Sequence, residues 1–84
     1  MIKILVTGGA GNVGGALARK LVESQKYFVV IADDLSTGSM SKLPSNKYKN
    51  WSFVNCDVNN YKEISEIMLV NHFDYVFHYA AVVG

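Results

Sequence analysis

The 84-residue chain has very little of several features that mark whole classes of protein. Its only cysteine is Cys56, which excludes an internal disulfide and fits a reducing compartment, so we expect a cytoplasmic protein. No apolar run approaches the length that spans a bilayer, and the apolar run after Met1 is too short for the core of a secretory signal. The net charge is only +1, which favours neither nucleic acid nor an anionic membrane as a partner.

Half of the residues are apolar, which is ample for the core of one small domain. Short runs rich in valine and isoleucine, typical of buried parallel strands, alternate with segments of helical spacing. We predict strands over 2–6, 27–32, 51–54 and 75–79, a first helix over 12–24 and a second that follows Asn60. This alternation predicts an α/β fold of the Rossmann type, a three-layer parallel sheet with four strands in the spatial order 3-2-1-4.

The apolar spacing also predicts which helical side chains are buried. In the first helix the expected inner stripe consists of Val13, Leu17 and Leu21, with Ala16 beside them. Asn60 predicts the N-cap of the second helix with Glu63 as its reciprocal partner. The expected stripe of that helix consists of Ile64, Ile67 and Met68.

The polar stretch 36–50 predicts a loop with a weak helical turn near residues 40–43. It contains three lysines, which are most simply solvated: Lys42, Lys47 and Lys49.

The segment from Thr7 to Gly14 reads Thr-Gly-Gly-Ala-Gly-Asn-Val-Gly and lies where the first strand turns into the first helix. Gly9, Gly11 and Gly14 satisfy the G-x-G-x-x-G pattern, and Gly8, Gly11 and Gly14 satisfy the wider G-x-x-G-x-x-G spacing. Glycines there permit a tight turn, close approach of a pyrophosphate to the backbone, and close helix packing. The helix start then offers N–H donors to the phosphates. No Gly-Lys-Ser/Thr follows, which excludes a P-loop, and the remaining alternative is a glycine-rich turn without a ligand.

Asp33 stands nineteen residues after Gly14, at the end of the second strand. A dinucleotide-binding fold places there the acid that accepts hydrogen bonds from the adenosine ribose, and its charge favours NAD over NADP. The alternative is a turn aspartate, and Asp34 is the weaker candidate. Asp57 and Val58 follow the third strand, at the wall of the adenine pocket, where Asp57 would accept from an exocyclic amine and Val58 would pack on the ring. On spacing alone, a helix-capping aspartate upstream of Asn60 is an equal alternative for Asp57.

Three further residues have chemistry that we interpret as structural. His78 is a single strand histidine, more often a satisfied core residue than a ligand. Cys56 is best read as a small buried hydrophobe. Neither of them, nor His72, has the spacing of metal ligands.

Four motifs in this order and spacing resemble the amino-terminal part of the NAD-dependent epimerase/dehydratase family. They are Thr-Gly-Gly-Ala-Gly-Asn-Val-Gly at 7–14, Asp-Asp-Leu-Ser-Thr-Gly at 33–38, Cys-Asp-Val at 56–58 and Val-Phe-His-Tyr-Ala-Ala at 76–81. The family comprises extended short-chain dehydrogenases that act on nucleotide sugars, and the resemblance covers essentially the whole chain. It makes adenine contact the favoured role of residues 57 and 58.

The resemblance implies a cofactor site for NAD at one edge of the sheet. Asn12 and Val13 would lie at the pyrophosphate, residues 33–38 would follow the adenosine ribose and its phosphate, and residues 79–82 would line the nicotinamide side. The complete set of implied cofactor residues is Gly8, Gly11, Asn12, Val13, Gly14, Asp33, Asp34, Leu35, Ser36, Thr37, Gly38, Asp57, Val58, Tyr79, Ala80, Ala81 and Val82. Val83 occupies a position at which some epimerases carry a lysine.

Catalysis in the resembled family needs a Tyr-x-x-x-Lys pair, and none of the five tyrosines here is followed four residues later by lysine. We therefore expect a fragment: residues 1–84 as the amino-terminal part of a Rossmann domain, without a substrate domain or catalytic residues. Its last strand would have an unpaired edge that invites self-association. The leading hypothesis is the NAD-binding portion of a nucleotide-sugar epimerase or dehydratase. The alternatives are a non-catalytic NAD-binding module and a nonfunctional remnant, so whether this chain acts as an enzyme stays open.

Overall fold

The computed structural model describes residues 1–35, 39–57 and 60–79. The elements follow the predicted alternation, and each predicted strand or helix boundary lies within one residue of the observed one. The elements are β1 (Ile2–Thr7), α1 (Asn12–Glu23), β2 (Tyr27–Asp33), the 3₁₀ turn η1 (Met40–Lys42), β3 (Trp51–Asn55), α2 (Tyr61–Val70) and β4 (Tyr75–His78). The weak helical turn expected near residues 40–43 is η1.

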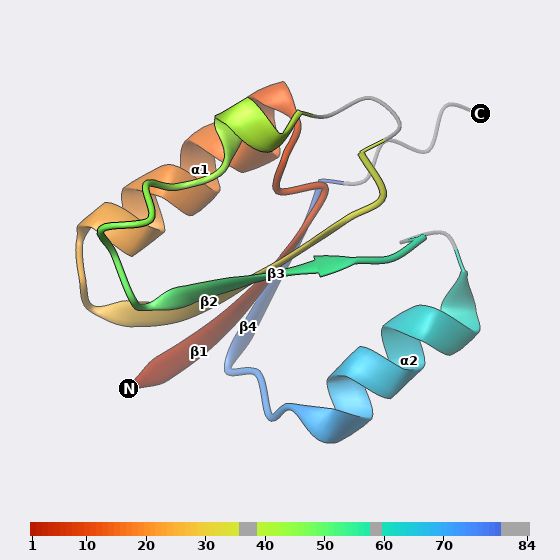
Figure 1. Cartoon of the computed structure of the whole chain (residues 1–84). Coiled ribbons are helices and arrows are strands. Elements are labelled where there is room, and N and C mark those ends of the chain that lie inside the picture. The colour runs from red at the N-terminus through yellow and green to blue at the C-terminus, as the bar shows by residue number, and fades with distance from the viewer. Residues whose placement is uncertain (36–38, 58–59, 80–84) are drawn as a thin grey trace.

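The four strands form one parallel sheet in the order β3-β2-β1-β4, as predicted. Figure 1 shows α1 on one side of the sheet and α2 on the other, which gives the three expected layers. Because all strands run the same way, their carboxyl ends meet at one edge. The register pairs Thr7 with His78 and Asp33 with Asn55 at that edge.

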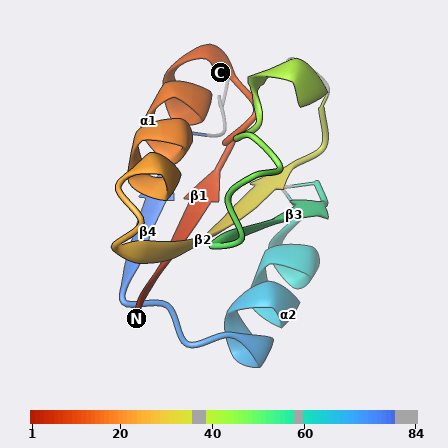
Figure 2. The same ribbon diagram turned by 60° about the vertical axis from the view of Figure 1, so that its left-hand side comes forward.

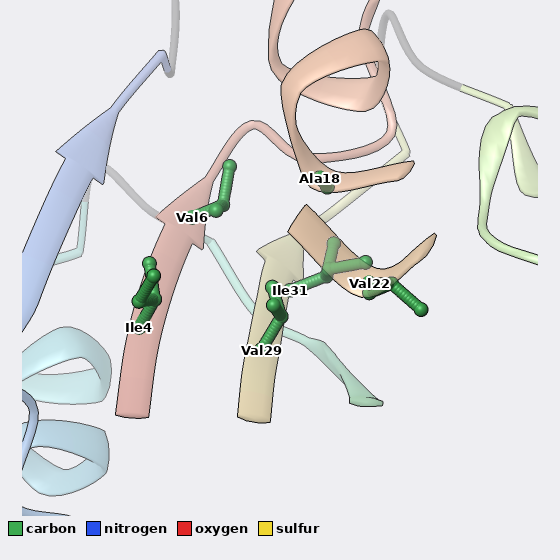
Figure 3. Packing of buried hydrophobic residues seen from close by; sticks show 6 residues of the cluster. All are labelled: Ile4, Val6, Ala18, Val22, Val29 and Ile31. Atoms are coloured by element: carbon green, nitrogen blue, oxygen red, sulfur yellow. The ribbon is translucent and has the colours of Figure 1, made fainter. Parts of the chain in front are cut away.

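Successive side chains along the central strands β1 and β2 point to opposite faces of the sheet, so the core has one part on each face. Figure 3 shows the face under α1, where Ile4 and Val6 of β1 and Val29 and Ile31 of β2 pack against the helix. The opposite face is built from Leu5, Val30, Ala32 and Cys56, with Ile64, Ile67 and Phe73 packed against them. Cys56 is therefore a small buried hydrophobe, as predicted, with 5% of its surface exposed.

The predicted inner stripe of α1 is wrong by one residue. Val13 is 66% exposed and Ala16 is exposed, whereas Ala18 and Val22 are fully buried. Leu17 and Leu21 are half-buried, and Leu21 packs against the edge of the core under α1, so that part of the prediction is confirmed. The spacing of apolar residues permits two adjacent stripes, and the observed one continues the line of buried Gly14, which faces the turn that precedes the helix.

The second helix begins as predicted, at Asn60. Its side-chain oxygen accepts hydrogen bonds from the backbone N–H groups of Lys62 and Glu63, at 3.0 and 3.4 Å. The N–H of Asn60 itself donates to the Asp57 carbonyl at 2.9 Å, in place of the reciprocal bond expected from the Glu63 side chain. Ile64 and Ile67 pack against the sheet as expected, but Met68, also expected in the buried stripe, is 47% exposed and is not part of that cluster. No helix within the described residues is long and apolar enough to cross a membrane.

The corrected stripe of α1 makes a testable distinction between two valines of one helix. Val22→Ala should lower the free energy of unfolding by about 2 kcal/mol, because it leaves a cavity between α1 and the sheet. Val13→Ala should change it by less than about 0.5 kcal/mol, since the side chain is exposed. Urea unfolding followed by circular dichroism measures both. A larger loss of unfolding free energy for Val13→Ala than for Val22→Ala would show that the helix buries the stripe predicted from the sequence.

Candidate functional site

The glycine-rich segment forms a tight turn between β1 and α1. Gly8 has a φ of 71°, a backbone conformation that favours glycine. Its N–H donates to the Ala32 carbonyl at 2.8 Å, and its own carbonyl accepts from the N–H of Gly11 at 3.0 Å. The turn is thus closed on itself and anchored to β2, and Gly11 serves as the N-cap residue of α1.

At two other glycines there is little room for a Cβ, against backbone at Gly14 and against a side chain at Gly9. A Cβ on Gly14 would lie 2.4 Å from the Gly8 carbonyl oxygen, closer than real Cβ contacts allow. A Cβ on Gly9 would lie 2.5 Å from Cγ2 of Ile31, on β2. At Gly11 the corresponding contact, again with the Gly8 oxygen, is a milder 3.3 Å. Close packing of the helix, predicted for the last glycine, is therefore a contact with the turn rather than with a strand.

The start of α1 is electrically suited to an anion. Gly11 provides no side-chain cap, and the first turn contains no acidic residue. Asn12 and Val13, the first helical residues, are exposed at the carboxyl edge of the sheet. The first-turn N–H groups and the positive end of the helix dipole therefore have no carboxylate within that turn.

Asp33 ends β2 beside this turn and is only 6% exposed. Its Oδ2 accepts a hydrogen bond from the N–H of Ala10, at 2.9 Å, and its Oδ1 accepts one from the N–H of Leu35, at 2.8 Å. Leu35 has a φ of 64°, so the chain turns sharply directly after the carboxylate. Each oxygen of an ionised carboxylate can accept more than one hydrogen bond, so these two contacts do not saturate the group. Asp34 is exposed, and residues 36–38 lie outside the described part of the chain.

The segments after β3 and β4 meet the same edge. The N–H of Cys56 donates to the Asp33 carbonyl at 3.1 Å, which brings exposed Asp57 next to the end of β2. The N–H of Tyr79 donates to the Thr7 carbonyl at 2.9 Å, and its Cβ lies beside Gly14. Val58 and residues 80–82, also expected at the site, lie outside the described residues.

Two residues near this edge, His78 and Cys56, have side chains that could react or bind a ligand, but their surroundings give each a structural role. His78 is exposed, so the prediction of a core position is wrong, but it is satisfied: its Nδ1 shares a 2.6 Å hydrogen bond with Oγ1 of buried Thr7. Burial raises the pKa of the Cys56 thiol, and the nearby carboxylates of Glu63 and Asp57 raise it further. A thiol in this environment is a weak nucleophile. No group of three or more potential metal-ligating His, Cys, Asp or Glu side chains occurs among the described residues.

Sequence reasoning missed the part played by the segment after β2. Figures 1 and 2 show η1 beside the start of α1. The N–H of Ser39 donates to the Ala10 carbonyl at 3.0 Å, and Nζ of Lys42 donates to Oδ1 of Asn12. Lys42 is half-buried, so its interpretation as a solvated loop lysine is wrong. Thirty positions separate it from Asn12, and no local pattern signals such a pair.

Comparison with known proteins shows which family the chain belongs to. The model of the NAD dependent epimerase/dehydratase family matches residues 4–84. The chain belongs to this family. Residues 1–79 thus carry, in the described parts, the glycine turn, the acid at the end of β2 and the sheet order that the sequence predicted.

Three individual proteins illustrate the likeness. A probable UDP-arabinose 4-epimerase 1 of Oryza sativa subsp. japonica is 37% identical over 84 residues, which is 94% of this chain and 20% of that protein. The structure of UDP-glucose 4-epimerase with UDP-glucose from Thermotoga maritima has a TM-score of 0.82 and 34% identity, over 98% of this chain and 25% of that one. UDP-glucose 4-epimerase from Brucella ovis in complex with NAD has a TM-score of 0.79 and 34% identity, over 96% and 23%. The chain therefore spans about a quarter or less of the length of these relatives.

The crowding at the glycine turn predicts that replacing Gly14 by alanine destabilises the protein, although alanine usually stabilises a helix relative to glycine. Alanine in a helix interior is intrinsically favoured over glycine by about 1 kcal/mol. Gly14→Ala should nevertheless lower the free energy of unfolding by about 1–3 kcal/mol, because backbone atoms must move to admit the methyl group. Gly11→Ala, with only the 3.3 Å contact, is the matched control and should cost less. Equal losses in a urea titration, or a gain at position 14, would contradict the close approach.

Proposed function

We propose that this chain binds NAD through the adenosine diphosphate half of the cofactor, at the carboxyl edge of the sheet. The observation that carries the proposal is the position of the Asp33 carboxylate, held against the glycine turn by the N–H of Ala10 and next to the uncapped start of α1. One acidic acceptor and one set of anion-binding N–H groups thus lie side by side. A nucleoside diphosphate presents a ribose diol and a diphosphate in the same relation.

The described residues around the glycine turn support this assignment. The N–H groups at Asn12 and Val13 would bind the diphosphate, because no side chain at Gly11 or Gly14 stands in the way. The Asp33 oxygens retain acceptor capacity for the hydroxyls of the adenosine ribose. Asp34 and Leu35, with residues 36–38, would follow the ribose and its phosphate, and Asp57 with Val58 would contact the adenine. Tyr79 and residues 80–82 would line the nicotinamide side.

The same carboxylate supports selection of NAD over NADP. A 2′-phosphate would place negative charge against Asp33, which is 6% exposed and therefore poorly screened by solvent. A 2′-hydroxyl instead donates to the carboxylate in a charge-assisted hydrogen bond.

We further propose that the chain serves an NAD-dependent enzyme acting on a nucleotide sugar. Support comes from the family and from relatives whose names specify UDP-sugar epimerases. When bound, NAD would supply the chemistry of reversible hydride transfer from a sugar carbon. The role of residues 1–84 is to bind and orient that cofactor. The proposal assigns them no acid or base, because none of the five tyrosines precedes a lysine at the required spacing.

The Asp33 assignment is tested by Asp33→Asn, which removes the charge and keeps the shape. Calorimetric titration of the 84-residue chain should show NAD binding weakened by about 10- to 100-fold, the equivalent of a lost charge-assisted hydrogen bond. NADP binding should weaken much less, so the preference between the two cofactors should shrink.

Asp74→Asn is the matched control, since it makes the same chemical change on an exposed carboxylate that also accepts a backbone N–H, that of Lys3 at 2.9 Å, and that lies just before β4, away from the proposed site. It should leave the preference for NAD in place. Circular dichroism is needed for both variants, because the Asp33 carboxylate also accepts two backbone N–H groups. A folded Asp33→Asn chain with unchanged affinities would refute the ribose assignment.

We also propose that the outer edge of β4 lets two copies of the chain associate. β4 pairs only with β1 among the described strands, and Tyr75 and Val76 are 57% and 45% exposed. An apolar strand with an open edge is a template for pairing. Sedimentation should show association that grows with concentration and that Val76→Lys reduces. Ser52→Lys, on the edge strand β3, is the control and should have no effect. A monomer at all concentrations would refute the proposal.

A further inference from the structure

Lys42 is a basic side chain that the fold brings to the start of α1 from a distant part of the chain. Its Nζ donates to Oδ1 of Asn12, the first residue of the helix, at 2.5 Å. The ammonium therefore lies over the same turn to which the diphosphate of NAD is assigned above. An ammonium group has three donors, so the bond to Asn12 leaves it capable of further hydrogen bonds.

The backbone around Lys42 is fixed from several sides. Its carbonyl accepts a hydrogen bond from Nη1 of Arg19 at 2.6 Å. The N–H of Ser39 donates to the Ala10 carbonyl within the glycine turn, and Leu43 packs against the core under α1. Contacts other than those of the ammonium therefore determine the position of η1. The backbone of η1 then places the Lys42 ammonium at the start of α1.

The helix dipole opposes a cation at that position, and the carboxylate beside the turn, that of Asp33, already accepts hydrogen bonds from two backbone N–H groups. The first turn of α1 is the positive end of its dipole, and it contains no acidic residue. A cation is normally stabilised at the opposite end of a helix, where Lys20 lies in this one. Asn12 is uncharged and offers the ammonium only a neutral acceptor. A bound diphosphate would supply the missing negative charge to both the ammonium and the first-turn N–H groups.

We propose that Lys42 binds an anionic oxygen of the NAD diphosphate and that Asn12 holds its ammonium in place for this contact. The inference rests on the proposed function, and it adds to the site a charged ligand from η1 that the glycine motif does not contain. In this arrangement the negative Asp33 carboxylate would accept from the ribose hydroxyls. The positive Lys42 ammonium would donate to the neighbouring diphosphate of the same ligand.

The test uses the 84-residue chain and three probes: NAD, ADP and adenosine. Lys42→Met keeps the length of the side chain and removes its charge, so it should weaken NAD and ADP binding about tenfold at low salt. Adenosine, which has no phosphate, should bind as before. The difference between the variant and the original chain should narrow as salt is added, because salt screens a partly exposed charge pair.

Two further variants separate phosphate binding from support of the fold. Lys42→Arg keeps a cation and should restore most of the affinity, whereas Lys20→Met removes an exposed lysine at the far end of α1 and should change nothing. Equal affinities of Lys42→Met and the original chain for NAD would overturn the inference and leave the proposed function standing. A uniform loss for all three probes, not rescued by arginine, would show a purely structural role and also overturn it. Failure of the original chain to bind NAD or ADP would refute the proposed function itself.

Discussion

The contact between Gly14 and the Gly8 carbonyl determines how α1 lies on the sheet. With 2.4 Å between that oxygen and the position of a Cβ, only glycine lets the first turn of the helix come this close to the turn that precedes it. The line of buried residues then runs from Gly14 through Ala18 to Val22, four residues at a time. The packing of the core under α1 and the exposure of the helix start at the edge of the sheet are therefore consequences of one close backbone approach.

Asp33 connects this turn to β2 and is both a structural residue and the proposed ribose acceptor. A buried carboxylate is unfavourable unless donors surround it, and here the N–H groups of Ala10 and Leu35 supply them. The same two bonds orient the carboxylate before any ligand arrives. In the proposed function, the cofactor meets an acceptor that is already in place, and little ordering of side chains is needed on binding.

The sequence predicted most of the fold because the decisive signals are local or follow from connectivity. Apolar runs located the strands, Asn60 located the start of α2, and alternation of strand and helix with right-handed crossovers led to the order β3-β2-β1-β4. Asp33 was predicted at the end of β2 because the spacing from the glycines reflects one helix and one strand. What the pattern could not resolve was a choice between two adjacent helical stripes, since Leu17 and Val22 are equally apolar.

The candidate site was less predictable where it depends on contacts across the fold. The bond of Lys42 to Asn12 joins residues thirty apart, and it requires η1 to lie over the start of α1. Nothing in the composition of residues 36–50 distinguishes Lys42 from Lys47 and Lys49. His78 was likewise expected in the core, because a single strand histidine is more often a satisfied core residue than a ligand. It instead ends an edge strand, where a side chain can be exposed and still bond Thr7. Such outcomes are set by tertiary packing rather than by local propensity.

In the proposed function, the charges at the carboxyl edge let a nearly neutral chain select an anionic cofactor. With a net charge of +1, the protein as a whole exerts almost no long-range attraction on a dinucleotide. Recognition must then come from a few groups at short range, where partial burial weakens screening by solvent and salt. The structure offers the uncapped start of α1, which would bind the diphosphate in the proposed function, with Lys42 beside it and, at the end of β2, the carboxylate of Asp33. Positive and negative groups a short distance apart discriminate by geometry, because a ligand must place its phosphates and its hydroxyls correctly at the same time. In this chain the glycine turn sets that geometry, since it holds both the helix start and, through Ala10, the carboxylate.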